Sequence, residues 1–400
     1  MTFELYEYEL SELVQIKYGK NQKKVQNDNG KYPIMGTGGL MGYATEYLYD
    51  KPSVLIGRKG SISKVKYIEE PFWTVDTLFY TEVNEELVHP KYLYYYLSQI
   101  DFNYYNEGTT IPSLRTETLN KILIQIPTLN IQKRIVSIIE KFDLKCVSNE
   151  KINRKLEAMC KALFKHWFID FNFPNEGGLP YKYNGGKMIE SELGEIPESW
   201  EIVSIGDVCN INQESLSKKE KWNFINYLDT GNITRNKIDT IQHIDVRKDK
   251  VPSRAKRKIR SNDIVFSTVR PNQQHYGIIK KPLENMLVST GFVVLSSKGF
   301  YSNDLIYLWL TQEQVLDSLQ SIAEQSTSAY PSIKPNDISS LKILLPTKRE
   351  LEMLAKIIEV QNNLIWNNQQ ENKKLSEIRD ALLPKLLSGE IEIPDESVVD

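Results

Sequence analysis

The stretch Ile111-Pro112-Ser113-Leu114 returns later in the chain as Tyr330-Pro331-Ser332-Ile333, at an offset of 219 residues (330 − 111 = 219). The same offset carries Ile126-Pro127-Thr128 onto Leu345-Pro346-Thr347 without a gap. It still holds at Leu163 and Leu382. A register that stays fixed over this length indicates two copies of one unit, in which the end of a globular domain runs into a long helix.

The segments that follow the two proline motifs have the apolar spacing of helices, and residues 130–170 contain neither proline nor glycine. Steps of seven residues give the first seam position, at Ile135, Phe142, Asn149, Leu156 and Leu163 and at Leu354, Gln361, Asn368, Leu375 and Leu382. The second seam position is expected three residues on, at Ile138, Lys145, Ile152, Met159 and His166 and at Ile357, Leu364, Glu371, Ile378 and Lys385. This spacing predicts an imperfect coiled coil.

Asn149 and Asn368 occupy the same heptad position, since 368 − 149 is again 219. A buried asparagine in a seam costs stability but fixes the helix register, so we expect the two helices to pair with each other. The alternative is two unrelated surface helices with polar breaks. An antiparallel pair of about 35–40 residues would span roughly 50–60 Å and act as a spacer between two heads.

The fold class that follows is α+β, with two mixed α/β domains separated by two long antiparallel coiled-coil helices and an internal pseudo-two-fold repeat. The expected boundaries are a first head at 1–128, a central helix at 129–171, a linker at 172–195, a second head at 196–346, a second helix at 347–389 and an acidic tail at 390–400.

Composition excludes several classes of protein. A hydrophobic content of 40% and a charged content of 26% are typical of soluble globular domains. No stretch approaches the roughly 20 apolar residues of a membrane span, and the acidic N-terminus lacks a signal-peptide layout, so we expect a cytoplasmic protein without membrane contact. Three cysteines and four histidines, without CxxC or HExxH spacing, predict neither a disulfide framework nor a metal site.

Five motifs spread along the chain are distinctive, beginning with ALFKHWFIDF at 162–171 and GEIPESW at 194–200. The first resembles the end of the central helix of type I restriction–modification specificity subunits, and the second resembles the start of their second target-recognition domain. LLPKLLSGEI at 382–391 resembles their C-terminal signature, and IGRKGSI at 56–62 and GTTIPSL at 108–114 resemble recurring elements of the heads. The resemblance covers nearly the whole chain. The second head departs from the first at 267–271, and the first head lacks the IPESW lead-in, so identical DNA contacts are not expected.

This resemblance implies a subunit without catalysis of its own. Each head would enter the major groove of double-stranded DNA and read one half of a bipartite target. The paired helices would set the spacing between half-sites and dock two methyltransferase subunits, and restriction/translocase subunits would complete the complex. S-adenosylmethionine, ATP and Mg²⁺ would belong to those partners, with no cofactor in this chain.

The motifs that are missing agree with a binding protein. The sequence has no GxxxxGK[ST] phosphate loop, no (N/D/S)PP(Y/F) methyltransferase motif and no GxSxG nucleophile elbow. Three alternatives stay open. They are a stand-alone nuclease or methyltransferase with degenerate motifs, a coiled-coil scaffold that does not bind DNA, and an orphan subunit that supports methylation but not restriction.

Candidate DNA-binding residues are chosen by side-chain chemistry: arginine and lysine suit guanine or phosphate, asparagine and glutamine suit adenine, and hydroxyls suit phosphates. In the first head they are Arg58, Lys59 and Ser61, in a glycine-flanked loop, and Asn106, Thr109, Thr110 and Arg115. In the second head they are Arg270, Asn272, Gln273, Gln274 and His275, with Ser326, Thr327, Ser328 and Lys334. The alternative for Arg58, Lys59 and Ser61 is a tight hairpin whose arginine is solvated, and the alternative for the 106–115 cluster is a loop that packs the start of the helix.

The second head also contains a strongly basic stretch. Residues 247–260 carry eight basic side chains and one acidic side chain, although the whole chain has a net charge of −2. Lys256, Arg257, Lys258 and Arg260 are expected to hold phosphates. A solvated loop would explain the same composition.

Overall fold

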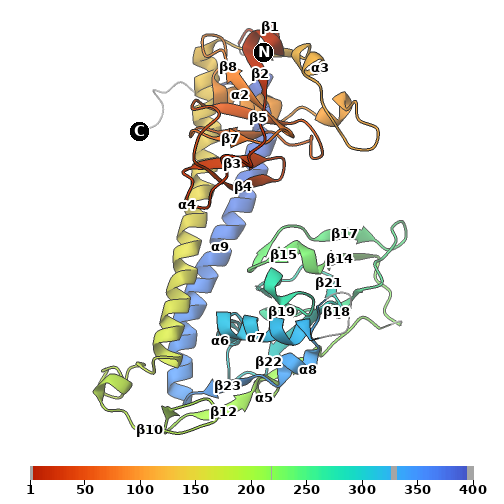
Figure 1. Ribbon diagram of the computed structural model, residues 1–400. Coiled ribbons are helices and arrows are strands. Elements are labelled where there is room, and N and C mark those ends of the chain that lie inside the picture. The colour runs from red at the N-terminus through yellow and green to blue at the C-terminus, as the bar shows by residue number, and fades with distance from the viewer. Residues whose placement is uncertain (1–2, 218, 326–330, 394–400) are drawn as a thin grey trace. The chain divides into compact units, whose positions relative to one another are not determined.

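The computed structural model describes residues 3–217, 219–325 and 331–393. The chain divides into two compact units, of which the first comprises Met1–Asn149 and Gln370–Asp400 and the second comprises Glu150–Gln369. Each unit contains one α/β head and part of each of two long helices (Figure 1).

The two long helices are α4 (Leu129–Phe168) and α9 (Lys348–Leu387), each of 40 residues. Thr347 caps the start of α9, where its Oγ1 donates to a Glu350 carboxylate oxygen that also accepts the Thr347 amide N–H. Both helices are followed by a left-handed residue, Phe171 after α4 and Gly389 after α9. α4 contains no proline, whereas α9 continues through Pro384 near its C-terminal end.

The helices pack side by side and antiparallel in each unit (Figure 1). In the first unit, Arg379 Nη1 donates to Asp143 Oδ1 at 2.7 Å, and Asn149 Nδ2 donates to Asn372 Oδ1 at 2.8 Å. Partner numbers therefore fall along α9 as they rise along α4. The predicted α+β fold with paired helices is confirmed.

The second seam position was predicted one residue too early. The side chains four residues after the first position include the buried Ile139, Cys160 and Ile358, whereas five of the apolar side chains three residues after it are exposed. Exposed fractions of 41%, 55%, 40%, 45% and 46% belong to Ile152, Met159, Ile357, Leu364 and Ile378. Apolar side chains occur at both spacings, so periodicity alone could not choose between them.

The first head contains one four-stranded sheet, one three-stranded sheet and a pair of strands, in the orders β2-β8-β5-β6, β4-β3-β7 and β1-β9. Its elements are β1 (Tyr6–Glu9), α1 (Leu10–Leu13), β2 (Val14–Tyr18), β3 (Tyr32–Gly36), β4 (Gly39–Ala44), β5 (Ser53–Gly57), β6 (Lys66–Ile68), β7 (Trp73–Thr74), β8 (Leu78–Val83), α2 (Pro90–Leu97), η1 (Phe102–Tyr105), α3 (Thr116–Asn120) and β9 (Leu123–Ile126).

The second head has two four-stranded sheets, ordered β13-β22-β19-β20 and β17-β14-β21-β18, and the strand pairs β15-β16 and β12-β23. Its elements are β12 (Glu201–Ser204), α5 (Ile205–Val208), β13 (Cys209–Ile211), β14 (Phe224–Leu228), η3 (Thr230–Asn232), β15 (Ile233–Thr234), β16 (Lys237–Ile238), β17 (Gln242–Asp245), β18 (Ala255–Lys258), β19 (Asp263–Ser267), η4 (Pro271–Gln273), β20 (Tyr276–Ile279), β21 (Met286–Ser289), β22 (Phe292–Ser297), α6 (Asn303–Leu310), α7 (Glu313–Glu324), α8 (Pro335–Ser339) and β23 (Lys342–Leu345).

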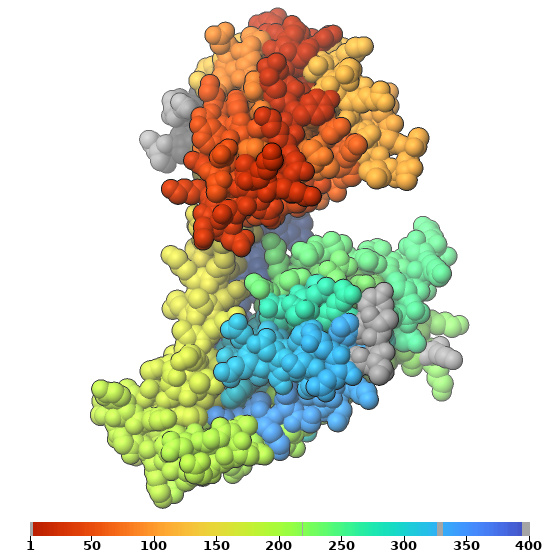
Figure 2. All heavy atoms as spheres, in the orientation of Figure 1, coloured from red at the N-terminus to blue at the C-terminus, as the bar shows by residue number. Residues whose placement is uncertain are grey.

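A linker joins α4 to the second head through η2 (Lys182–Asn184), β10 (Met188–Ile189) and β11 (Ile196–Pro197). Figure 2 shows this linker, in yellow-green, on the surface of the second unit. It is rich in glycine and proline, and its Tyr183 is 88% exposed.

The two heads repeat the same strand pairing. In the first head Ile56 of β5 faces Phe79 of β8, and in the second Phe266 of β19 faces Val293 of β22. Each head also contains one parallel strand pair, β3 with β7 and β14 with β21. The internal repeat seen in the sequence is therefore a repeat of topology, to which the second head adds the β15–β16 hairpin and the edge strand β18.

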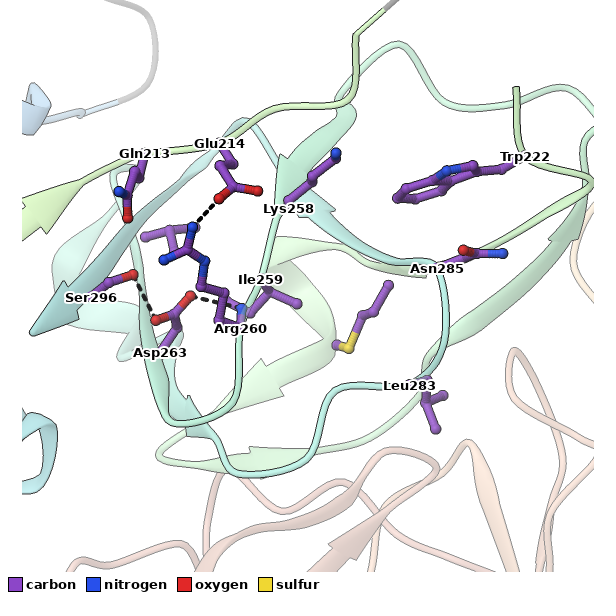
Figure 3. Close-up of a pocket in the computed structure, with 12 residues that line it drawn as sticks. Gln213, Glu214, Trp222, Lys258, Ile259, Arg260, Asp263, Leu283, Asn285 and Ser296 are labelled. Carbon is purple, nitrogen blue, oxygen red and sulfur yellow. Dashed lines mark hydrogen bonds and ion pairs between the residues drawn. The ribbon is translucent and has the colours of Figure 1, made fainter. Parts of the chain in front are cut away.

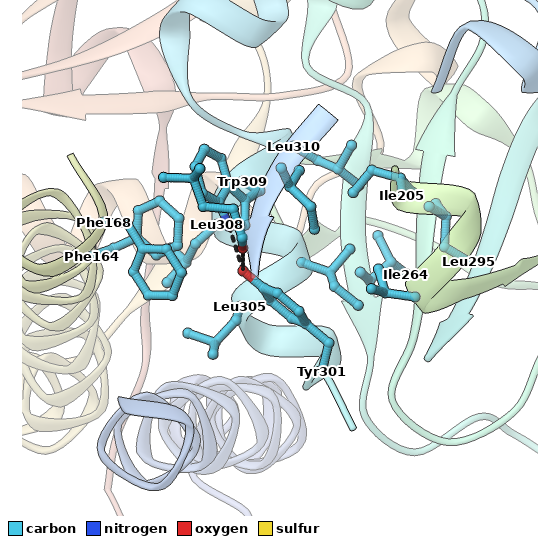
Figure 4. Packing of buried hydrophobic residues seen from close by; sticks show 14 of the residues in the cluster. Phe164, Phe168, Ile205, Ile264, Leu295, Tyr301, Leu305, Leu308, Trp309 and Leu310 are labelled. Carbon is cyan, nitrogen blue, oxygen red and sulfur yellow. Dashed lines mark hydrogen bonds between the residues drawn. The ribbon is translucent and has the colours of Figure 1, made fainter. Parts of the chain in front are cut away.

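Each head shares a core with both helices. In the second unit, Phe164 and Phe168 of α4 stack at 4.7 Å between ring centroids, and Trp309 of α6 meets Phe164 edge-on at 5.1 Å (Figure 4). Leu354 and Ile358 of α9 belong to the same cluster. Full burial of such side chains stabilises by about 1.5–3 kcal/mol each, so the heads are fused to the helix pair rather than tethered to it.

The first unit is built in the same way. Ile135 and Ile139 of α4 join Leu383 and Leu386 of α9 in the core of the first head. In the described part of the chain, no helix combines the length and apolar character that crossing a membrane requires.

Candidate nucleic-acid interface

The loop after β5 brings the two candidate clusters of the first head together. All five residues of β5 are buried, and the chain emerges at Arg58. Lys59 then forms a β-bridge with Ser113, and the Gly60 amide donates to the Pro112 carbonyl at 2.9 Å. Gly60 is left-handed at φ +84, a conformation that favours glycine. Lys59 and Ser61 are exposed on one side of this bridge, and Thr109 and Thr110 on the other.

Two candidates of the first head have partners inside their own loop. The Asn106 side-chain oxygen accepts the amides of Gly108 and Ser113, both at 2.9 Å, and so shapes the loop. Arg115 forms an ion pair with Glu107 at 3.1 Å. These contacts favour a structural role for Asn106, whereas the exposed threonines beside it are open to a ligand.

Arg58 is half-buried and held on two sides. Its Nη1 donates to the Asp76 carbonyl oxygen at 2.9 Å, and its guanidinium lies 5.1 Å from the centroid of the Tyr18 ring. A guanidinium fixed in this way keeps its other N–H groups in a defined direction, which suits recognition of an anion or a base edge.

The second head repeats the bridge. Val269 pairs with Ser332, and the Arg270 amide donates to the Pro331 carbonyl at 2.9 Å. Arg270 takes the place of Gly60 and is also left-handed, at φ 48. This conformation costs a residue other than glycine roughly 1–3 kcal/mol, and such strain concentrates at functional sites. The predicted Ser326, Thr327 and Ser328 lie outside the described residues, and Lys334 is exposed beside α8.

The candidates after Arg270 divide into two kinds. Asn272 and Gln273 are exposed, whereas Gln274 and His275 are half-buried. His275 Nδ1 donates to the Ile233 carbonyl at 2.7 Å, which makes this nitrogen the protonated one. The Gln274 carbonyl accepts the amide of Arg235 at 3.0 Å. Gln274 and His275 therefore hold the β15–β16 hairpin in place.

Sequence reasoning missed that hairpin. Its central residues, Arg235 and Asn236, are both left-handed, at φ 46 and φ 64. The Asn236 side-chain oxygen accepts the Ile278 amide at 2.8 Å, and its carbonyl accepts Gln369 Nε2 of α9 at 3.4 Å. The asparagine in this short turn was an available signal, because asparagine tolerates left-handed backbone.

Four of the eight basic residues in the basic stretch form ion pairs within the head. Lys258 pairs with Glu220, Arg260 pairs with Glu214, and Arg247 and Lys248 both reach Asp245. Lys256 is exposed on β18, and Arg257 is half-buried. The positive field is consequently weaker than the composition suggests.

A hollow of about 200 Å³ lies beside these ion pairs, lined by Trp222, Asn285 and Lys258 among others (Figure 3). At its inner wall, Ser296 Oγ and the Arg260 amide donate to the Asp263 carboxylate at 2.6 and 2.8 Å. Burial raises the pKa of Asp263 above its ordinary value. The charged side chains of this hollow therefore already have hydrogen-bond or ion-pair partners within the head, which favours a structural role for them. Among the described residues, no group of histidine, cysteine, aspartate and glutamate is arranged to hold a metal ion.

The predicted register residues both form hydrogen bonds between the helices. Asn149 donates to Asn372 in the first unit, and Asn368 Nδ2 donates to Asn153 Oδ1 at 2.8 Å in the second. Asn153 and Asn372 were not predicted, although they are themselves 219 residues apart (372 − 153 = 219). The repeat thus supplies each asparagine with another as partner.

The chain thus has two heads with the same loop geometry, each joined to a pair of long helices. Comparison with known proteins shows which family has this arrangement. The family model described as type I restriction modification DNA specificity domain matches residues 4–158 and 197–379. The chain belongs to this family. It is a DNA-specificity subunit of a type I restriction–modification system, and its part in the enzyme is sequence selection rather than catalysis.

Known relatives span most of the chain. The MjaIX specificity subunit of Methanocaldococcus jannaschii is 26% identical over 365 residues, which cover 87% of this chain and 79% of that protein. The HindI specificity subunit of Haemophilus influenzae is 23% identical over 378 residues, covering 80% and 81%. The crystal structure of a type I S subunit from M. genitalium shares the fold, with a TM-score of 0.60 at 16% identity, and covers 98% of this chain and 97% of its own.

Proposed function

We propose that each head of this specificity subunit reads one half of a bipartite target in duplex DNA through the major groove. Residues 1–128 act as the first recognition domain and residues 196–346 as the second. The bridge from Lys59 to Ser113, repeated from Val269 to Ser332, carries this proposal. In each head it places arginine, lysine, hydroxyl or amide side chains around one loop, and these are the groups that contact bases and phosphates.

The helices supply the second part of the proposal. α4 and α9 set the distance between the half-sites, because both are continuous and both are buried in the cores of the heads. The apolar side chains that the seam leaves exposed, such as Met159 and Leu364, offer a docking surface on the helices. Two methyltransferase subunits dock there, one for each copy of the repeat.

Restriction/translocase subunits join the same complex, and it acts on cytoplasmic DNA. S-adenosylmethionine, ATP and Mg²⁺ are bound by these partners. The family assignment and the missing nucleotide-binding and methyltransferase motifs in this sequence support that division of labour.

A matched insertion tests the spacing role. Seven residues are inserted between Lys155 and Leu156 of α4, and seven between Ile365 and Trp366 of α9, which lie opposite each other because Asn153 pairs with Asn368. At 1.5 Å per residue the pair lengthens by about 10 Å, or roughly three base pairs of 3.4 Å. Mapping methylated adenines in cells that express the chain with its methyltransferase should show a longer gap between unchanged half-sites.

The control carries the insertion in α4 alone, which displaces the seam and should reduce methylation without a new gap. A changed half-site with the original gap would refute the spacing role.

A further inference from the structure

Strand register places one turn of each head at an equivalent position. The two bridges align Lys59 with Val269 and therefore Gly57 with Ser267, which pair with Leu78 and Phe292 respectively. The offset along β8 and β22 is therefore 214 (292 − 78 = 214), which carries Asp76 onto Thr290. These residues lie in the turns that lead into β8 and β22.

In both turns, an arginine guanidinium donates a hydrogen bond to the carbonyl at the equivalent position. Arg58 Nη1 donates to the Asp76 oxygen at 2.9 Å, and Arg257 Nη2 donates to the Thr290 oxygen at 3.4 Å. The two arginines are not equivalent in sequence, because the strand pairing aligns Arg58 with Thr268. One comes from the loop after β5 and the other from β18. The heads thus bring arginine to the same place from different strands.

The same turn also holds the candidate recognition loop in each head. The Thr77 carbonyl accepts the amide of Arg58 at 2.9 Å, and the Gly291 carbonyl accepts the amide of Thr268 at 2.8 Å. Each guanidinium therefore lies beside the loop that carries the exposed candidates, such as Lys59.

Neither of these arginines is neutralised by a carboxylate. Among the described residues, neither Arg58 nor Arg257 has a carboxylate within ion-pair distance, whereas Lys258 and Arg260, which follow Arg257 in the sequence, do. The Arg257 Nε is buried without a hydrogen-bond partner, and burial lowers the pKa of its guanidinium. A partly desolvated cation without a counter-charge is costly, and a bound anion relieves that cost.

We infer that Arg58 and Arg257 are structural equivalents, each of which contacts a backbone phosphate of the half-site read by its own head. This inference rests on the proposed function. Arg257 of β18 would then contact phosphate in the second head as Arg58, in the loop after β5, does in the first.

The test measures binding of the full chain to three duplexes by fluorescence anisotropy. One duplex contains the target found by methylation mapping, and the other two have one half-site scrambled. The variants Arg58→Gln and Arg257→Gln keep an N–H donor for the turn carbonyl and lose the charge. Each should weaken binding to all three duplexes alike and lower the salt slope by about one. Between 50 and 200 mM salt, the loss of affinity should then be about 3.5-fold smaller than in the wild type.

Two further variants separate charge from structure. Arg257→Lys should keep the wild-type slope, because it restores the positive charge. Lys348→Gln removes an 88% exposed charge at the start of α9 and should change nothing. A wild-type slope in Arg257→Gln, a changed base preference at an unchanged slope, or an equal loss in Arg257→Lys would each overturn the inference.

A different result of the same binding experiment would refute the proposed function. If the wild type binds all three duplexes equally, the heads do not read half-sites, and the salt slopes still decide whether the arginines contact phosphate.

Discussion

The asparagine pair of the second unit offers a sharp test of how the helices are held together. Asn153 of α4 is 8% exposed, and its side-chain oxygen accepts Asn368 Nδ2 of α9 at 2.8 Å. The perturbation is leucine at either position or at both. Leucine is close to asparagine in size and suits the surrounding seam, where Leu156 and Ile365 are neighbours along the helices.

The magnitudes follow from desolvation. In Asn153→Leu, the amide of Asn368 remains in the seam without its acceptor, which costs about 1–3 kcal/mol. In Asn368→Leu, the side-chain oxygen of Asn153 loses the N–H donor of Asn368 instead. In the double variant both polar groups are gone, so the change should be neutral or stabilising. We expect the double variant to be more stable than either single variant, with a coupling energy of about 2–6 kcal/mol, which is the sum of the two single losses.

Guanidinium unfolding followed by tryptophan fluorescence measures this cycle. The signal reports mainly on the second unit, because five of the six tryptophans lie there. Those five are Trp167, Trp200, Trp222, Trp309 and Trp366. Single variants as stable as the wild type, or effects that simply add, would refute the reasoning.

Removing both asparagine pairs tests the register role of Asn149 and Asn368. If the asparagines fix the register, methylation mapping of the variant with leucine at Asn149, Asn153, Asn368 and Asn372 should show a second gap length beside the original one. A single unchanged gap would contradict that role and leave the coupling energy intact.

Three further predictions concern the second head. Lys280→Met should cost about 3–5 kcal/mol in unfolding experiments, because Lys280 and Asp304 form an ion pair in which both side chains are 10% exposed; the isosteric replacement of both residues should recover most of that loss. Because the pKa of Asp263 is raised in the folded state, its contribution to stability is greatest below the ordinary pKa of 3.8 and is lost as pH rises through the folded-state pKa. The free energy of unfolding of Asp263→Asn should therefore fall less between pH 3.8 and neutrality than that of the wild type. Gln273→Ala should alter the preferred base at one position of the mapped target, whereas Lys256→Ala should weaken every duplex alike and reduce the salt slope.

The repeat and the helices were predictable because their signals are local or periodic. A fixed offset of 219 needs no knowledge of tertiary contacts, and a proline-free segment is helical on its own evidence. The seam was predicted less well. Apolar side chains stand at Ile138 and Ile139, and again at Leu364 and Ile365, so both spacings satisfy a heptad. Packing against the partner helix selects the second of each pair, and sequence periodicity contains no information about that choice.

The basic stretch shows why the candidate site was harder to predict than the fold. Its eight positive charges fall within 14 residues of sequence, at 247–260, but the acids that neutralise Lys258 and Arg260 lie 38 and 46 residues away, at Glu220 and Glu214. Long-range pairing therefore turns two apparent phosphate ligands into internal ion pairs. Arg257 has no carboxylate partner among the described residues, because its side chain reaches the Thr290 carbonyl instead. The charges that such a surface can offer to DNA are those that folding leaves without an internal partner. Composition counts all basic residues and does not show which of them are paired.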